Sequence, residues 1–145
     1  MAALPFCESG VRAVLKAPKP KEQPVYGEGL SGMLLRRRHD LSLTSKQAAD
    51  TMGVNWWTYM TWESKGREPT CTWYPEIIAF LGREPWPEPV SLPEQLRAAR
   101  LRRGLSIKVA AEGLGVDEGT FGRWESGAWK PQARSLPIIE LFLRG

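Results

Sequence analysis

The side chains that most often carry out catalysis or bind metal ions are scarce in this sequence. His39 is the single histidine, and the two cysteines, Cys7 and Cys71, stand in unrelated contexts without Cys-x-x-Cys spacing. A zinc site needs several such ligands close together. The sequence also has no Ser/His/Asp set, no glycine-rich phosphate loop and no helically spaced pair of carboxylates. We therefore expect no enzyme activity, no metal, no cofactor and no small-molecule substrate.

The remaining chemistry is that of charged and polar side chains, which can bind a partner. Lys and Arg number 20 against 16 Asp and Glu, and the net charge is +4 with a pI near 9.3. This mild positive charge suits a polyanion such as nucleic acid but does not demonstrate one. No apolar stretch approaches the length of a membrane span, and the start has no secretory pattern. We expect a cytoplasmic protein with no membrane partner.

A repeated motif organises the rest of the sequence. The segment TYMTWESKGREP at 58–69 returns as TFGRWESGAWKP at 120–131. Aligned without a gap, the halves share residues of buried type, glycines and prolines: Leu34 with Leu96, Leu43 with Leu105, Gly53 with Gly115, Val54 with Val116, Trp62 with Trp124, Pro69 with Pro131 and Phe80 with Phe142. Most charged positions differ. This pattern is typical of one scaffold used twice with different surfaces.

The repeat defines the expected domains. We expect a flexible N-terminal arm at 1–28, a first domain at 29–82, a proline-rich linker at 83–91 and a second domain at 92–145. The arm includes KAPKPKEQP, which favours extended chain, and VRAVL at 11–15, which could form a helical turn. Prolines in the linker make it stiff, so the domains should keep a preferred relative geometry.

Each half is predicted to be a series of short helices, and no strand pattern is found. Ser106 is a good N-cap for IKVAAEGLG, and Asp117 and Asn55 would cap the helices that follow. Gly53 and Gly115 should take positive φ and turn the chain sharply between two helices. Such a pair of helices is the signature of a helix-turn-helix.

At this point the sequence resembles the repressor/Cro-type (XRE-like) helix-turn-helix domains of bacterial and phage regulators. The resemblance rests on RAARLRRGLS, VAAEGLGV and RWESGAWKP in the second half. The first half departs from it at Ser42, where the family has glycine, and at Lys65, which shifts the following glycine. The resemblance implies an all-α fold of two tandem five-helix lambda-repressor-like domains, with the third helix of each entering the DNA major groove.

The resemblance also assigns structural roles. Arg38 would pair with Glu63, and Arg100 with Glu125, inside each domain. Trp62 and Trp124 would be core aromatic residues. The DNA-facing candidates lie near the starts of the second and third helices of each half and in the loop after the third, where amides and short or basic side chains can reach phosphates. They are Thr44, Ser45, Lys46, Asn55, Trp56, Trp57, Thr58, Thr61, Lys65 and Arg67 in the first half, and Ser106, Lys108, Glu118, Thr120, Arg123, Trp129 and Lys130 in the second.

Some candidates have two interpretations. The family has glutamine where this chain has Ser45 and Ile107, which puts that backbone contact in doubt in the second half. Glu118 would repel phosphate unless it reads a cytosine amino group. Trp56 and Trp57 could pack on sugar or a thymine methyl, or could form an interface with a protein partner or a second copy.

Two functional hypotheses follow. The first is a sequence-specific regulator of transcription that binds double-stranded DNA, with repression as its simplest mode. Its two domains would imitate within one chain the two-fold dimer that such domains form, with half-sites about 34 Å apart. The alternative is a protein-interaction module on the same fold, such as an antitoxin, an anti-repressor or a phage protein that blocks a host factor.

Overall fold

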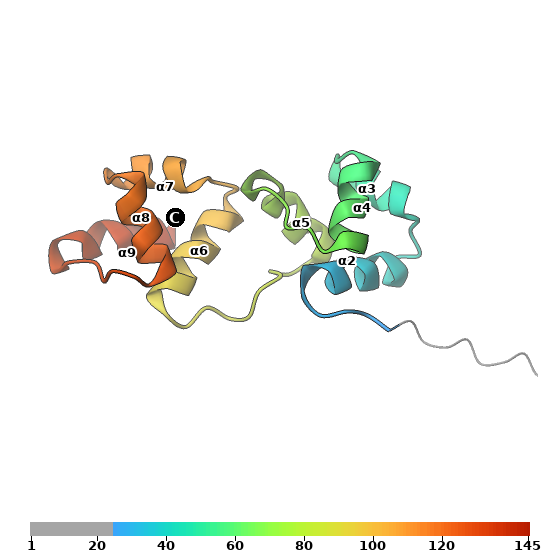
Figure 1. Cartoon of the computed structure of the whole chain (residues 1–145), viewed down its shortest axis with the longest axis horizontal. Helices are drawn as coiled ribbons and strands as arrows, with labels where there is room; N and C mark the ends of the chain where they lie inside the picture. Colours follow the sequence, from blue (N-terminus) through green and yellow to red (C-terminus); the bar gives the residue numbers. More distant parts are fainter. Residues whose placement is uncertain (1–24) are drawn as a thin grey trace, which may run out of the picture.

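The structure, a computed structural model, describes residues 25–145. The regular secondary structure of this part of the chain is all helical (Figure 1). It contains eight α-helices, two short 3-10 helices and no strand. The elements are α2 (Gly29–Asp40), α3 (Ser45–Met52), α4 (Trp56–Lys65), η1 (Cys71–Trp73), α5 (Tyr74–Leu81), α6 (Leu92–Arg102), α7 (Ile107–Leu114), α8 (Glu118–Ser126), η2 (Ala133–Ser135) and α9 (Leu136–Arg144). Residues 1–24 lie outside this description, and with them the expected helical turn at 11–15 and most of the expected arm.

The helix boundaries follow from their capping residues. Asn55 accepts a hydrogen bond from the Trp57 amide, and Asp117 accepts one from the Thr120 amide, so both predicted caps are confirmed. Gly53 and Gly115 have φ of 69° and 70° at the C-caps of α3 and α7. In this left-handed region only glycine is free of a steric penalty, which is why the turns end these helices sharply.

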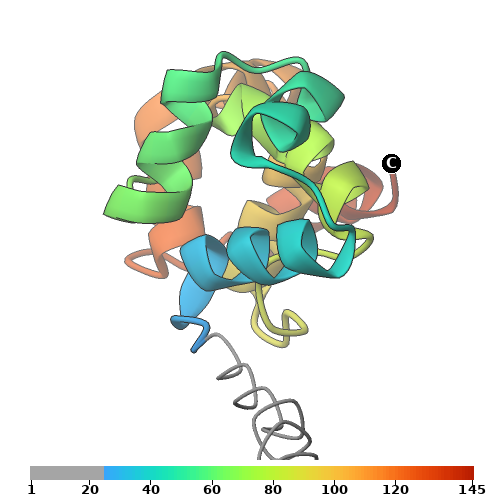
Figure 2. The same ribbon diagram turned by 90° about the vertical axis from the view of Figure 1, so that its right-hand side faces the viewer.

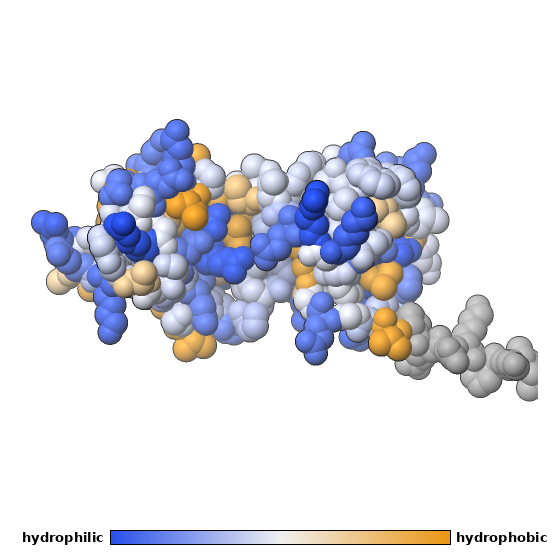
Figure 3. All heavy atoms as spheres, in the orientation of Figure 1, coloured by the Kyte–Doolittle hydropathy of each residue, from blue (hydrophilic) through white to orange (hydrophobic). Residues whose placement is uncertain are grey.

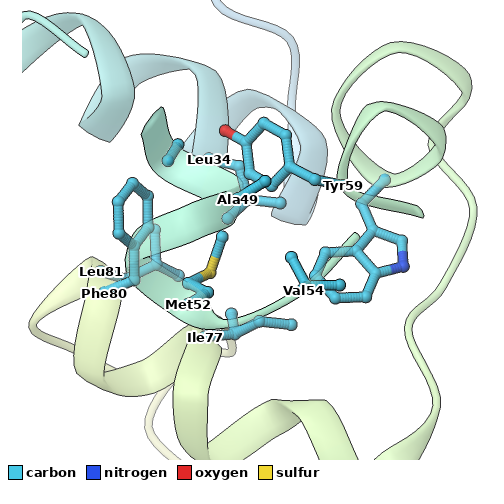
Figure 4. Packing of buried hydrophobic residues seen from close by; sticks show 10 residues of the cluster. Leu34, Ala49, Met52, Val54, Tyr59, Ile77, Phe80 and Leu81 are labelled. Atoms are coloured by element: carbon cyan, nitrogen blue, oxygen red, sulfur yellow. The ribbon is translucent and has the colours of Figure 1, made fainter. Parts of the chain in front are cut away.

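Helices α2 to α5, which we call the first unit, enclose one cluster of buried side chains (Figure 4). Leu34, Ala49, Tyr59 and Ile77 have no exposed surface in this cluster. Ala48 and Ala49 are both buried on α3, as the close crossing of α4 requires. Apolar burial of this kind is the main force that holds a small helical unit together.

Helices α6 to α9, the second unit, enclose a separate cluster. Its members include Leu96, Ala111, Phe121, Trp124 and Ile139, all with 5% or less of their surface exposed. Leu96, Ala111 and Trp124 occupy the positions of Leu34, Ala49 and Trp62 in the repeat. Both tryptophans predicted to be core residues are therefore buried.

The two units are joined by a packed contact between α5 and α6. Tyr74, Ala98 and Leu101 are buried, yet they belong to neither cluster. Gly104, with φ of 67°, lies so close to Pro75 that an added Cβ would be 3.1 Å from its Cγ atom. The units therefore touch directly as well as through the connecting segment.

The connecting segment 83–91 has no helix or strand, but residues near its start are anchored to both units. Glu84 forms an ion pair with Arg102 on α6, with Nη2 to Oε2 at 3.0 Å. The Trp86 indole donates to Glu84 and packs against the Tyr74 ring, with the ring centroids 5.9 Å apart. These contacts restrain the segment against both units.

The third helices of the two units, α4 and α8, lie on the same face of the molecule. This face is toward the viewer in Figure 1 and on the left in Figure 2. Both helices run from top to bottom in Figure 1. A two-fold axis through that face would instead make them run in opposite directions, so the expected imitation of a two-fold dimer is wrong.

Candidate nucleic-acid interface

An ion pair buried behind α4 fixes this helix against α2. Arg38 donates from Nη2 to Glu63 Oε1 at 2.6 Å and from Nε to Oε2 at 2.9 Å, and its Nη1 donates to the Leu43 carbonyl at 3.2 Å. The Tyr59 hydroxyl donates to the same carboxylate. One arginine thus links the turn after α2 to α4, which confirms the predicted Arg38–Glu63 pair.

The second unit has the same arrangement at the equivalent positions. Arg100 donates from Nε to Glu125 Oε2 at 2.7 Å and from Nη2 to Oε1 at 2.6 Å. Its Nη1 donates to the Leu105 carbonyl at 3.0 Å. This side-on geometry, with two parallel hydrogen bonds, confirms the second predicted pair. Phe121 stands where Tyr59 stands in the first unit, so the second carboxylate lacks that hydroxyl donor.

The contacts within the first ion pair shift the pKa values of its members. Burial raises the pKa of Glu63, but the hydrogen bonds from Arg38 and Tyr59 outweigh burial and hold that pKa below its usual value. The hydrogen bond to Glu63 raises the pKa of Arg38, and burial together with Glu63 raises that of Tyr59. The folded protein therefore favours the ionised carboxylate, and both partners serve to position α4.

In the second unit, the N-termini of α7 and α8 lie at the surface of the molecule. Ser106 accepts the Val109 amide at 3.2 Å, and Lys108 is exposed one residue into α7. The Thr120 amide and hydroxyl both donate to Asp117, which leaves the Thr120 hydroxyl occupied by the cap. Glu118, the first residue of α8, is exposed. The free basic group at this end is therefore Lys108.

The loop after α8 positions the exposed side chain of Arg123. The guanidinium carbon of Arg123 lies 4.1 Å from the centre of the Trp129 ring, and the Trp129 amide donates to the Arg123 carbonyl at 3.2 Å. Trp129 keeps 52% of its surface exposed, and Lys130 beside it is exposed. A cation held over an aromatic face loses rotational freedom before it binds. Arg123 is thus partly ordered while its other donors remain available.

In the first unit, α3 begins with a complete capping box. Thr44 accepts the Gln47 amide, and the Gln47 side chain accepts the Thr44 amide. Ser45 accepts a hydrogen bond from the Trp56 indole at 3.0 Å, which joins the starts of α3 and α4. Lys46 is exposed next to this contact. Ser45 therefore supports Trp56 directly.

The start and end of α4 expose aromatic and basic groups. Trp56 and Trp57 have 46% and 61% of their surface exposed, and their ring centroids are 6.3 Å apart. The Lys65 ammonium lies 5.2 Å from the centre of the Trp57 ring. Asn55 and Arg67 are also exposed. This surface is bulkier and more aromatic than its equivalent at α8.

One predicted contact residue is placed inside the molecule. Thr61 is 9% exposed, and its hydroxyl donates to the Thr58 carbonyl at 2.7 Å. Thr61 occupies the position of Arg123 in the repeat, but its short side chain is satisfied by its own helix and does not reach outward. Thr61 is therefore removed from the candidate surface, while Thr58 stays on it as a half-buried residue.

Two supporting contacts were not predicted from the sequence. Gln47 closes the cap of α3, and the Thr-x-x-Gln spacing of TSKQ is a recognisable capping-box signal. Tyr59 joins the Arg38–Glu63 pair, and its spacing of four residues from Glu63 places both on one helix face. Gln47 thus supports the exposed start of α3, and Tyr59 supports the buried ion pair behind α4.

The face that carries α4 and α8 is largely hydrophilic. In Figure 3 the most hydrophilic side chains stand out on both halves of this face, with smaller apolar areas between them. Beside α8 a hollow of about 700 Å³ is lined by residues that include Thr120, Trp129, Lys130, Gln132 and Arg134. The loop after α8 thus adds basic and polar groups to those of the helix.

Comparison with known proteins places the second unit in a class. Residues 92–145, which span α6 to α9, match a protein-family model described as a helix-turn-helix domain. The match supports a helix-turn-helix domain in this part of the chain, and such a domain suggests a DNA-binding regulator. No curated protein and no solved structure matches the chain. Among the helices of residues 25–145, none has both the length and the apolar character needed to cross a membrane.

Proposed function

We propose that this protein is a sequence-specific, double-stranded DNA-binding regulator of transcription, built from two tandem repressor/Cro-type helix-turn-helix units. The family match of residues 92–145 is the observation that carries the proposal. The first unit supports it through equivalent helices, glycine turns and a matching buried arginine–glutamate pair. The units would be of bacterial or phage type and would act in the cytoplasm by binding alone, without enzyme activity.

Binding would begin with the DNA backbone. Lys46 and Lys108 occupy equivalent exposed positions in the first turns of α3 and α7, where the helix N-terminus also attracts phosphate. Their contacts would release counterions, so affinity would fall steeply as salt rises. These contacts would set the position of each unit on the duplex without reading its sequence.

Base recognition would come from α4 and α8. Arg123 is exposed on α8 and ordered over Trp129, and arginine is the usual partner of the guanine O6 and N7 acceptors. On α4 the equivalent reach is supplied by Trp57, whose exposed ring can contact a thymine methyl. Because Trp56, Trp57 and Lys65 on α4 have Glu118, Gly119 and Gly127 at the equivalent positions, the two half-sites should differ in sequence. Bound over a promoter, the protein would repress by occlusion.

Charge reversal on the second unit tests the proposal. We expect Lys108→Glu combined with Arg123→Glu to lower affinity for a duplex selected from a random pool by about tenfold or more, because a phosphate contact and a base contact are both lost. The measurement is a fluorescence anisotropy titration at several salt concentrations. The slope of log affinity against log salt should also become shallower.

A matched control separates specific loss from a change in net charge. Arg83→Glu combined with Arg144→Glu makes the same change in net charge at two exposed residues, in the connecting segment and at the end of α9, away from the starts of α7 and α8. This variant should bind nearly as the wild type does. Equal losses in both proteins, or wild-type binding that is absent at low salt, would contradict the proposal.

The alternative function is a protein-interaction module that uses Trp56 and Trp57. The observation in its favour is the pair of adjacent, exposed indoles at the start of α4, because aromatic residues are enriched in protein interfaces. A partner could be another protein or a second copy of the chain. An absence of duplex binding at low salt, with a folded wild-type protein, would favour this alternative.

A further inference from the structure

The contact between the two units joins surfaces that are not equivalent. It is made by α5 of the first unit and α6 of the second. The equivalent of α5 is α9, and the equivalent of α6 is α2. In a two-fold interface the contact of α5 with α6 would be matched by an equivalent contact of α9 with α2, since residue i meets j wherever j meets i. No comparable contact joins α2 and α9 in the described part of the chain. The contact is therefore head-to-tail.

The surface residues support this asymmetry. Ala98 and Leu101 of α6 are buried against the first unit, whereas the equivalent positions on α2 are Arg36 and His39, which are exposed. In the same way Tyr74 is buried at the contact, and its equivalent on α9, Leu136, is 41% exposed. The sequence has been adapted at the one junction where two units meet.

The direction of the third helices agrees with the contact. Both α4 and α8 lie on one face and run the same way along it (Figures 1 and 2). Units related by translation present identical orientations to a duplex lying along that face. Units related by a two-fold axis present opposite orientations, which is why dimers of such domains read palindromes.

The relative orientation is held from several sides. Gly104 packs on Pro75, Glu84 pairs with Arg102, and Trp86 covers Tyr74. Reversing one unit on the DNA would require all of these contacts to break. The connecting segment would not need to stretch for such a reversal. The packed contact is therefore the feature that decides the orientation.

From this geometry, and resting on the function proposed above, we infer that the DNA site consists of two half-sites in the same orientation, a direct repeat in protein polarity. Their centres would lie about one helical turn apart. Because α4 and α8 carry different exposed residues, the repeat would not be visible as repeated bases. Only the orientation of the two units on the DNA is repeated. Equivalent residues of the two units would therefore contact the same strand.

A strand-resolved crosslinking experiment tests this inference. A photo-crosslinking amino acid is placed at position 46 in one full-length variant and at the equivalent position 108 in another. Each variant is irradiated on the duplex recovered from selection out of a random pool, and the crosslinked base is mapped on both strands. We expect both positions to crosslink to the same strand, at sites offset by about 10 base pairs.

The outcomes are distinct. Crosslinks on opposite strands, or from only one position, would overturn the direct repeat while leaving DNA binding intact. An absence of salt-sensitive binding to any duplex would overturn the proposed function itself. A third variant, Leu101→His, introduces the first unit's residue at the contact. Added to each of the two crosslinking variants, this change should leave the helical content unchanged and give crosslinks at several offsets, and an unchanged single offset would also overturn the inference.

Discussion

Glu63 is the residue that most directly holds α4, the third helix of the first unit, in position. Its carboxylate receives hydrogen bonds from Arg38 and from Tyr59, and it is 8% exposed. A buried charge is tolerated only when it is paired in this way. The pair therefore stabilises α4 only while Glu63 is ionised, which links folding to pH.

The sign of this pH dependence follows from the pKa of Glu63. Since the folded state holds that pKa below its usual value, the contribution to stability is fully present above the ordinary carboxyl pKa of about 4.3. It is lost as the pH falls below that value and through the folded pKa. We expect Glu63→Gln to lower the free energy of unfolding by about 3 kcal/mol at neutral pH.

Urea unfolding at a series of pH values measures this effect. The Glu63→Gln protein should lose less stability on acidification than the wild type does. Glu112→Gln, which changes an exposed carboxylate on α7, serves as the control and should follow the wild type. Parallel pH profiles for all three proteins would show that the buried pair does not contribute in this way.

At the residue scale, sequence reasoning found the Arg–Glu pairs but misplaced Thr61. The pairs could be predicted through the family resemblance, which fixes both partners. The sequence places Thr61, the equivalent of Arg123 in the repeat, among the short polar side chains of the third helix that could face DNA. The structure shows that a long arginine reaches solvent from this position, whereas a threonine turns back to the Thr58 carbonyl. Side-chain length decided the outcome.

At the scale of elements, two glycines with similar φ values are required for different reasons. Gly115 ends α7 with φ of 70°, and an added Cβ would meet no atom within 4 Å. Gly104 has φ of 67°, and an added Cβ would lie 3.1 Å from Pro75 Cγ and 3.4 Å from the Thr72 carbonyl oxygen. The first glycine is needed for its conformation alone, and the second also for close contact between units.

We therefore expect the two substitutions to differ. Gly115→Ala should cost about 1–2 kcal/mol, the penalty for a left-handed residue with a Cβ. Gly104→Ala should cost a further ~1–3 kcal/mol, because the crowded contact with Pro75 must also open. Thermal and urea unfolding of both variants would measure this order. A larger loss for Gly115→Ala would contradict the packing described at the junction.

Most helices could be predicted because the residues that begin and end them are close in the sequence to the helix itself. Asp117, predicted as the cap of the helix that follows it, stands directly before α8. The placement of Trp129 over Arg123 could not be predicted, because it depends on the path of a loop. The junction was also missed, although apolar Ala98 and Leu101 opposite polar Arg36 and His39 in the repeat are a signal that could have indicated it.

On the scale of the whole molecule, the arrangement of the two units determines what the protein could recognise. Their head-to-tail contact puts α4 and α8 on one face in the same direction, and the anchored segment 83–91 adds to its rigidity. Joining two weak binding units in a fixed geometry raises affinity without new contacts, provided that both can reach the duplex together.

Hydroxyl-radical footprinting of the full-length protein on its selected duplex tests the central claim most directly. If both recognition helices bind one duplex, two protected patches should appear on one side of the DNA, with centres about 10 base pairs apart. The Lys108→Glu, Arg123→Glu protein should lose protection at one patch first. A single protected patch in the wild type, or none at low salt, would contradict the account.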